Sequence, residues 1–208
     1  MVQRRSKETR AKVLEAATQL ILANGHESVS LKEISELSGV SNGSIFHHFG
    51  SKEGIIQALF VRERQRYLGS VADAILAFKG DPCDAIGEGA KAAMHYHAQF
   101  PQEYDRLVAE FSESEWLRRN EDVWLEAASA IERPVIEWAM PHFANGALPM
   151  LAPAAFQSMM LGPAEVATRS YRQGRFSGDL ETQIEAIGEF VALGIRALRD
   201  KARSVTAD

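Results

Sequence analysis

The chain has 208 residues, of which 46% are hydrophobic, and its formal net charge is −5. This length and apolar content suffice for a buried core in one large domain or two small ones. No apolar run reaches the ~18 residues that a membrane span needs, and the single cysteine, Cys83, excludes an intramolecular disulfide framework. The basic N-terminus is not followed by the apolar segment of a secretory signal, so we expect a cytoplasmic protein without a membrane partner.

Charge is distributed unevenly along the chain. Residues 1–12 contain five Lys or Arg side chains and one acidic side chain, Glu8. Residues 1–60 contain seven basic and six acidic side chains, so the acidic excess lies beyond residue 60. A basic arm on an acidic chain fits either an anionic partner that is met at one end or a solvated tail.

Two helices are expected in the first forty residues. Apolar side chains at helical spacing predict a helix over residues 7–23, which Asn24-Gly25 ends. Ser30-Leu31-Lys32-Glu33 is a capping box, in which the Ser30 hydroxyl caps the Glu33 N–H and the Glu33 side chain reaches back to Ser30. Gly39 then ends the second helix.

Asn42-Gly43, which lies between the apolar Val40 and Ile45, is by itself a strong signal for a β-hairpin. The surrounding helical period contradicts a hairpin, because no alternating strand pattern adjoins it. Ser41 is instead a suitable N-cap for a third helix, which Gly50 ends. Ser51 caps a fourth helix, which is expected from Lys52 to about Phe78.

The rest of the chain also has helical periodicity and no strand pattern. Pro and Gly residues divide it into segments, and the apolar positions of the last segment recur every three or four residues. The predicted helices cover residues 82–100, 101–111, 115–139, 154–173 and 180–200, with a loop over 141–153 and Pro134 as a candidate kink. We therefore predict an all-α fold of about nine helices, with residues 1–54 and 55–208 as two domains.

Signals for an enzyme or a metal site are weak. Residues 87–92 match the Gly-x-Gly-x-x-Ala pattern of dinucleotide-binding turns, but no strand precedes them, so close helix packing is the simpler interpretation. His47-His48 and His95-Tyr96-His97 have the wrong spacing for two ligands on one helix face, and Cys83 has no second cysteine. We expect no catalytic residue, metal or cofactor, and a helical enzyme or carrier stays a minor alternative.

The two short helices within residues 30–49 have the length and turn chemistry of a helix-turn-helix. Their apolar positions form a small core with the first helix, which leaves the polar side of the later helix at the surface. Hydrogen-bonding side chains on such a surface suit base edges and phosphates in a DNA major groove, or are simply solvated. The surface positions are Asn42, Gly43, Ser44, Phe46, His47 and His48.

Residues 8–55 resemble the N-terminal DNA-binding domain of the tetracycline-repressor (TetR-type) family of bacterial regulators. The residues that carry the resemblance stand in one order from the first helix to the start of the fourth. They are Ile21, Gly25, Ser30-Leu31, Ile34-Ser35, Ser38-Gly39-Val40-Ser41, Gly43-Ser44-Ile45-Phe46, His48-Phe49 and Ser51-Lys52-Glu53-Gly54-Ile55. Beyond this first quarter of the chain, only its length and helical content extend the resemblance.

The resemblance implies a homodimer that binds the two half-sites of a palindromic operator. The N-terminal domain of each chain would place its third helix in the major groove of one half-site. It implies base or groove contacts from Ser41, Asn42, Gly43, Ser44 and His47. It implies phosphate contacts from Ser30, Phe46, His48 and Lys52. Lys32, Arg4 and Arg5 are further candidates for DNA contact. The family commonly has tyrosine where this chain has Phe46, which cannot donate a hydrogen bond to a phosphate.

The resemblance also implies a C-terminal domain that binds a small-molecule effector and forms the dimer. Candidate effector contacts are Met94, His95, Phe111, Trp116, Trp124, Trp138, Met159 and Met160. Residues of these types are more often ordinary core. Candidate dimer contacts are Ile184, Ile187, Gly188, Val191, Gly194, Ile195 and Leu198, which alternatively face the core of their own chain.

The function that follows is a DNA-binding transcriptional regulator, in the first place a repressor that a small molecule releases from its operator. A helix-turn-helix regulator that a protein partner controls, or that has no ligand, is the alternative. A melting-temperature screen with hydrophobic compounds separates the two, because a ligand of the folded state raises the melting temperature.

Overall fold

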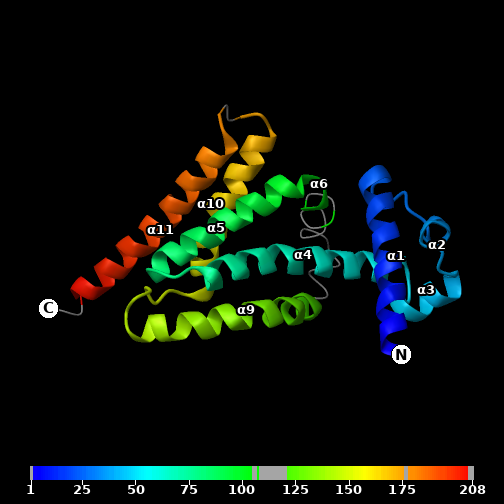
Figure 1. Cartoon of the computed structure of the whole chain (residues 1–208), viewed down its shortest axis with the longest axis horizontal. Coiled ribbons are helices and arrows are strands. Elements are labelled where there is room, and N and C mark those ends of the chain that lie inside the picture. The colour runs from blue at the N-terminus through cyan, green and yellow to red at the C-terminus, as the bar shows by residue number, and fades with distance from the viewer. Residues whose placement is uncertain (1, 105–106, 108–120, 176–177, 206–208) are drawn as a thin grey trace. The chain divides into compact units, whose positions relative to one another are not determined.

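The computed structural model describes residues 2–104, 107, 121–175 and 178–205, and Figure 1 shows the whole chain. All regular elements in these ranges are α-helices, nine in number, which confirms the predicted all-α fold. The chain divides into two compact units, residues 1–65 with 100–125 and residues 66–99 with 126–208. We call residues 1–65 the head and the second unit the body. In the described ranges, no helix has both the length and the apolar character to cross a membrane.

Three helices and the start of a fourth form the head. They are α1 (Val2–Asn24), α2 (Leu31–Ser38), α3 (Asn42–Phe49) and α4 (Lys52–Ala77). In Figure 1, α2 and α3 lie beside α1. Their apolar sides meet in one core, whose buried members include Val13, Leu14, Ala17, Ile21, Val29, Ile34, Ile45, Ile55, Ile56 and Leu59. The short helix α6 (Pro101–Tyr104) belongs to the same unit as the head.

The change from head to body falls inside α4. Ile55, Ile56 and Leu59, near the start of this helix, are buried in the head core. Packing therefore assigns the residues up to Gln65 to the first unit. We predicted the domain boundary between residues 54 and 55 from the end of the sequence motif, whereas the packing places the boundary of the compact unit after Gln65. The functional boundary at residue 54 stays a prediction.

The predicted ends of the second and third helices are confirmed. The Ser30 hydroxyl accepts a hydrogen bond from the Glu33 N–H at 3.2 Å, and the Ser30 N–H donates to Glu33 Oε2 at 2.8 Å, which completes the capping box. Gly39 and Gly50 follow α2 and α3 with φ of 66° and 73°. These left-handed values are easily adopted by glycine alone, so both helices end where the sequence predicts.

Helix α5 (Pro82–Gln99) is the centre of the body. It packs against α10 (Pro153–Arg172) and α11 (Leu180–Val205), and Figure 1 shows the three helices running side by side. Buried residues occur along the whole length of α5, from Cys83 to His97. They are spread around the helix because neighbours cover it on more than one side.

Glycines bring α5 close to its neighbours. A Cβ on Gly87 would lie 2.6 Å from the carbonyl oxygen of Gly188 in α11, and a Cβ on Gly89 would lie 2.8 Å from Ile75 in α4. The Gly-x-Gly-x-x-Ala segment lies within α5. The close-packing interpretation is thus confirmed, and a dinucleotide-binding turn is excluded because the segment is helical from before its first glycine.

Helix α9 (Glu121–Ala144) corrects one prediction. The helix expected to end at residue 139, before a loop from Pro141, continues through Pro134 and Pro141 to Ala144. Proline lacks an N–H, but its carbonyl still accepts, as the carbonyl of Pro141 does from the Asn145 N–H at 3.1 Å. The predicted start of this helix, residues 115–120, lies outside the described residues.

Arginines of α11 pair with the start of α5. Arg199 donates to Asp81 Oδ2 at 2.8 Å, and Arg196 pairs with Asp84. Burial raises the pKa of the adjacent Cys83 thiol to about 11. This cysteine is therefore protonated at neutral pH and poorly reactive, because the thiolate is the nucleophile.

We predict that Gly87→Ala lowers the free energy of unfolding by ~1–3 kcal/mol, the usual cost of overpacking. The new methyl group meets a backbone oxygen of α11, which can move away only if the two helices separate. Thermal or urea unfolding monitored by circular dichroism measures the change.

Gly69→Ala is the matched control, because Gly69 lies in α4 and a Cβ there meets nothing within 4 Å. We expect it to leave stability unchanged or to raise it by ~0.5–1 kcal/mol, since alanine favours helix. Equal stabilities of the two variants would contradict the close contact between α5 and α11.

Candidate nucleic-acid interface

Helix α3 has one buried side and one exposed side. Ile45 is buried in the head core and Phe49 packs against it. Asn42, Gly43 and His47 are exposed, as is Phe46, of which 66% is accessible to solvent. The predicted surface residues of the third helix therefore share a side, except that Ser44 and His48 are half-buried at its margins.

Serine hydroxyls hold the turn between α2 and α3. The Ser35 hydroxyl donates to the Val40 carbonyl at 2.7 Å, and the Ser38 hydroxyl accepts from the Val40 N–H at 3.2 Å. The Ser41 hydroxyl accepts from the Ser44 N–H at 3.3 Å and caps α3. The start of α3 is thus fixed by local hydrogen bonds, and the first N–H groups of such a helix have no partner within the helix.

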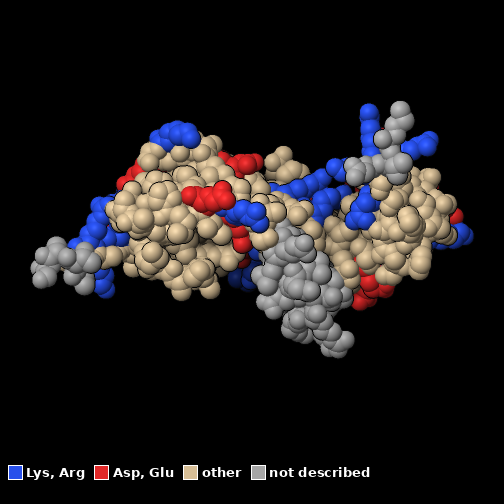
Figure 2. Space-filling model, turned by 90° about the horizontal axis from the view of Figure 1, so that it is seen from below, with Lys and Arg blue, Asp and Glu red and all other residues tan. Residues whose placement is uncertain are grey.

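Basic residues of α1 lie next to this turn. A hollow of about 390 Å³ is lined by Arg5, Glu8, Thr9, Lys12, Gly39, Val40, Ser41 and Ser44. It brings the predicted Arg5 together with the predicted Ser41 and Ser44. Figure 2 shows Lys and Arg side chains projecting from the head, at the right of the view.

Lys12 is a candidate that our sequence reasoning missed. Its signal is the spacing of Arg5, Thr9 and Lys12, which places all three on one face of α1. That face turns out to be the one next to the start of α3.

Two other predicted cations are held only by exposed ion pairs. Arg4 Nε lies 3.0 Å from Glu8, and Lys32 Nζ lies 3.8 Å from Glu36. Exposed pairs of this kind are worth only ~0–1 kcal/mol, so a phosphate competes with them readily.

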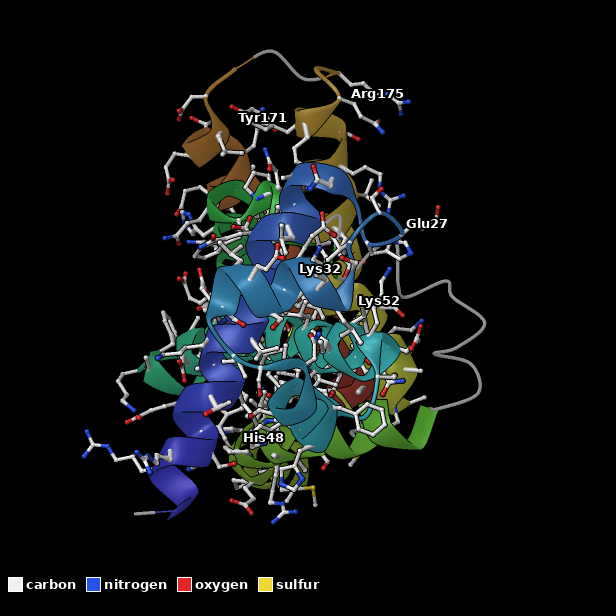
Figure 3. The ribbon with its side chains drawn as sticks, turned by 90° about the vertical axis from the view of Figure 1, so that its right-hand side faces the viewer. Glu27, Lys32, His48, Lys52, Tyr171 and Arg175 are labelled. Carbon is white, nitrogen blue, oxygen red and sulfur yellow. The ribbon has the colours of Figure 1, made fainter. Side chains whose placement is uncertain are left out.

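Lys52 is placed differently from the other predicted cations. Its ammonium group donates to the Glu27 carbonyl at 3.1 Å, and Figure 3 shows both residues on the same flank of the head. This bond ties the start of α4 to the loop after α1. Lys52 therefore has a structural partner in the absence of DNA.

The predicted effector residues do not form one buried set. Met94 is buried, Trp138 and Met160 are half-buried, and His95 and Met159 are exposed. Phe111 and Trp116 lie outside the described residues, as does the side chain of Trp124.

His97 is buried where His95 is not, because residues two apart point to different sides of a helix. Its ring lies 5.0 Å from that of Tyr67, which in turn lies 5.6 Å from the ring of Tyr96. The sequence did not predict that these three rings form one buried cluster.

A hollow of about 430 Å³ lies between α5 and α11. It is lined by Phe78, Asp84, Gly87, Glu88, Lys91, Gly188, Glu189, Ala192, Leu193 and Arg196. None of the predicted effector residues belongs to this lining. Lys91 is held there by Glu185 at 2.6 Å and Glu88 at 2.9 Å.

The apolar stripe predicted for the dimer faces the chain's own core. Ile184, Gly188, Val191 and Ile195 are buried, while Ile187, Gly194 and Leu198 are half-buried. A second stripe on α11 is exposed instead, at Ala186, Phe190, Leu193 and Ala197. On α10, the exposed Ala155, Met159 and Val166 have a similar spacing. Periodicity finds apolar stripes, but only packing decides which of them is covered.

Metal binding has little support in the geometry. Across the described ranges, no three His, Cys, Asp or Glu side chains gather as a metal ion would require. His47 and His48 are ring neighbours at 5.4 Å in an edge-to-face arrangement, and one of them is exposed while the other is half-buried.

Comparison with known sequences points to one group of proteins. The family model described as "Bacterial regulatory proteins, tetR family" matches residues 13–59. The HTH-type transcriptional regulator UidR of Escherichia coli (strain K12) is 35% identical over 74 residues. That match covers 36% of this chain and 38% of UidR, so the chain matches well under half of that relative's length.

Solved structures are similar over most of the chain. A TetR family transcription regulator from Marinobacter aquaeolei VT8 has a TM-score of 0.73 at 17% identity, covering 92% of this chain and 97% of that one. The transcriptional regulator FadR from Bacillus subtilis, solved in complex with stearoyl-CoA, has a TM-score of 0.65 at 18% identity, covering 89% and 98%. At these identities the likeness shows the fold alone.

We predict that Ser30→Ala lowers the free energy of unfolding by ~0.5–2 kcal/mol, because the N-cap of α2 is lost. Hydrogen bonds from Ser30 hold the pKa of the Glu33 carboxyl below its ordinary value of 4.5. The stabilisation by the charged carboxylate is therefore present above pH 4.5 and is lost as the pH falls through the lowered pKa. Chemical unfolding at pH 7 and at pH 3 measures both effects.

Ser28→Ala is the control, because Ser28 is an exposed serine two residues upstream. We expect it to change stability by less than ~0.5 kcal/mol. A Ser30→Ala variant as stable as the control would show that the capping box does not stabilise α2.

Proposed function

Because the chain belongs to the tetR family of bacterial regulatory proteins, we propose that it is a transcriptional repressor. In this proposal it binds a palindromic operator as a dimer, in the cytoplasm, and leaves the operator when a small molecule binds the body. The observation that carries the proposal is the exposed side of α3, where Asn42, Gly43, Phe46 and His47 lie together.

In the proposed complex α3 lies in the major groove. The Asn42 amide suits adenine, to which it can donate one hydrogen bond and from which it can accept another, and the His47 imidazole can hydrogen-bond a base edge. Gly43 allows the backbone of the first turn to approach the bases. Phe46 would contact a thymine methyl group or a sugar, because its ring carries no hydroxyl for a phosphate.

Phosphate contacts would come from the rim of this surface. Arg4, Arg5, Lys12 and Lys32 are the cations that we assign to the DNA backbone, which attracts them at any sequence. Ser30, Ser41 and Ser44 would add hydrogen bonds from the ends of their helices. His48 and Lys52 complete the set, and Lys52 would exchange the Glu27 carbonyl for a phosphate.

We assign the dimer interface to the exposed stripes of α10 and α11 rather than to the stripe first predicted. Phe190 and Leu193 are 63% and 50% accessible to solvent in the single chain. They belong to the exposed stripe Ala186, Phe190, Leu193 and Ala197, in which spacings of four and three residues alternate. This alternation is the one that packs helices against each other along a seam. Two such helices from each chain would form a four-helix bundle, which is a common dimer architecture.

The proposed effector is a small molecule that binds the body. FadR from Bacillus subtilis was solved with stearoyl-CoA, which makes an acyl-CoA the first compound to try in a melting-temperature screen. A ligand that binds the folded body raises the melting temperature by mass action. A regulator controlled by a protein partner would show no such rise with any compound.

A gel shift with the DNA upstream of the chain's own gene tests DNA binding. We expect a shifted band at low salt that competitor DNA of unrelated sequence removes less readily than operator DNA does. No shift of any promoter-derived fragment at low salt would refute the repressor proposal.

We predict that Gly43→Ala separates stability from DNA binding. A Cβ at Gly43 meets nothing within 4 Å in the protein, so the variant should be as stable as the wild type or more stable. The methyl group would stand between the first turn of α3 and the bases, and we expect operator affinity to fall by about tenfold or more. Fluorescence anisotropy with labelled operator measures the affinity.

Gly69→Ala, which makes the same change on α4, should leave operator affinity unchanged. If Gly43→Ala bound operator as well as this control, the backbone of α3 would not approach DNA closely. The proposed contact at its first turn would then be wrong.

We predict that Leu193→Glu converts the dimer into a monomer, because a carboxylate at the centre of an apolar seam is desolvated without a partner. The side chain is exposed in the single chain, so the chain should still fold. Sedimentation velocity measures the change in mass. Met150→Glu, at an exposed residue between α9 and α10, is the control and should remain a dimer. A dimeric Leu193→Glu variant would place the interface elsewhere.

A further inference from the structure

We propose that Arg10 of α1 is a positioning residue that sets the angle of α3 in the head without itself touching DNA. This inference rests on the proposed function, since it gives α3 the role of reading the operator. It assigns to a cation of the basic arm a role other than phosphate binding.

Arg10 holds the end of α3 in two ways. Its guanidinium donates to the carbonyl oxygen of His48 at 2.7 Å. The same group lies over the ring of Phe49, with 4.4 Å between the guanidinium carbon and the ring centroid. Arg10 is half-buried, so both contacts are partly shielded from water and count for more than exposed ones.

The end of α3 needs such a partner. The last carbonyl groups of a helix find no N–H partner within the helix. At the end of α3, the Gly50 N–H donates to the carbonyl of Phe46 at 2.8 Å. Arg10 satisfies the carbonyl of His48. A cation at this position also interacts favourably with the partial negative charge at the C-terminal end of a helix.

The start of α3 is held independently of Arg10. There the turn is closed by the Ser35 and Ser38 hydroxyls, and Ser41 caps the helix. With both ends held and Ile45 buried between them, α3 has little freedom to rotate. Without Arg10, the last turn would be held mainly by the packing of Phe49 against the core.

Rotation of α3 would weaken its recognition of a particular DNA sequence. Hydrogen bonds to base edges require donor–acceptor distances of about 2.7–3.2 Å and good alignment, whereas the flexible cations of the rim can follow a phosphate. A loose α3 should therefore lose operator affinity while it keeps most of its affinity for unrelated DNA.

Arg10→Met tests the proposal, because methionine replaces the aliphatic part of the arginine side chain with an unbranched chain of similar length and removes the guanidinium. We expect operator affinity to fall by ~10-fold or more, the order of discrimination from one good base contact. Affinity for unrelated DNA should change by less than about twofold, and the salt dependence of its binding should stay that of the wild type. Arg10→Lys should recover part of the loss, since it restores the donor but not the planar group over Phe49.

Arg5→Met is the matched control, because Arg5 is an exposed cation of the same helix. It should weaken binding to both DNAs, and it should reduce the slope of log affinity against log salt by about 0.9, as the loss of one phosphate contact does. If Arg10→Met behaved like this control, Arg10 would bind a phosphate and the proposal would be overturned. Unchanged operator affinity of Arg10→Met would overturn it as well.

A readout without DNA keeps this inference separate from the proposed function. Amide hydrogen exchange should be faster at Phe49 and Gly50 in Arg10→Met than in the wild type, and unchanged within α2. If the wild type bound no DNA, the proposed function would be refuted. The exchange measurement would still show whether Arg10 holds the end of α3. Equal exchange at Phe49 and Gly50 in the two proteins would show that Arg10 does not hold α3.

Discussion

The structure of the head depends on one constraint, which is the shortness of α3. A helix of eight residues is far below the ~12–15 residues at which isolated helices become even marginally stable in water. Its conformation is therefore imposed from outside. Ile45 holds it to the core, Ser41 caps its start, and Arg10 and Gly50 satisfy carbonyls at its end. In the proposed function, such a short helix can present a fixed pattern of hydrogen-bonding groups to the DNA bases only because both of its ends are held.

Several polar residues around α3 stabilise the head and are also predicted to contact DNA. The hydroxyls of Ser30 and Ser41 cap helices, and the Lys52 ammonium is bonded to a carbonyl of the head itself. Residues that a motif associates with DNA thus also stabilise the fold that presents them. In the proposed complex, we assign sequence readout to Asn42 and His47, because both side chains are exposed on α3 and can hydrogen-bond a base edge.

In the body, close packing has the corresponding role. Gly87 and Gly188 let the backbones of α5 and α11 approach each other, and the arginines of α11 bind the acidic start of α5. This contact uses the larger apolar stripe of α11, including Val191 and Ile195. The opposite side still carries Phe190 and Leu193. A helix that is apolar on two sides can serve its own core and a second chain at once, which is how we interpret α11.

The sequence by itself determined what local chemistry decides: the helical period, the capping box at Ser30, the glycine ends at Gly39 and Gly50, and the exposed side of an amphipathic α3. It also predicted the packing role of Gly87, because a glycine pair inside a helix has no other simple use. Only the tertiary structure decided which stripe of α11 is covered, that Met159 and His95 are exposed, and that Arg10 reaches His48. These depend on contacts between residues far apart in the chain, and periodicity shows that a helix has an apolar side without showing which neighbour covers it.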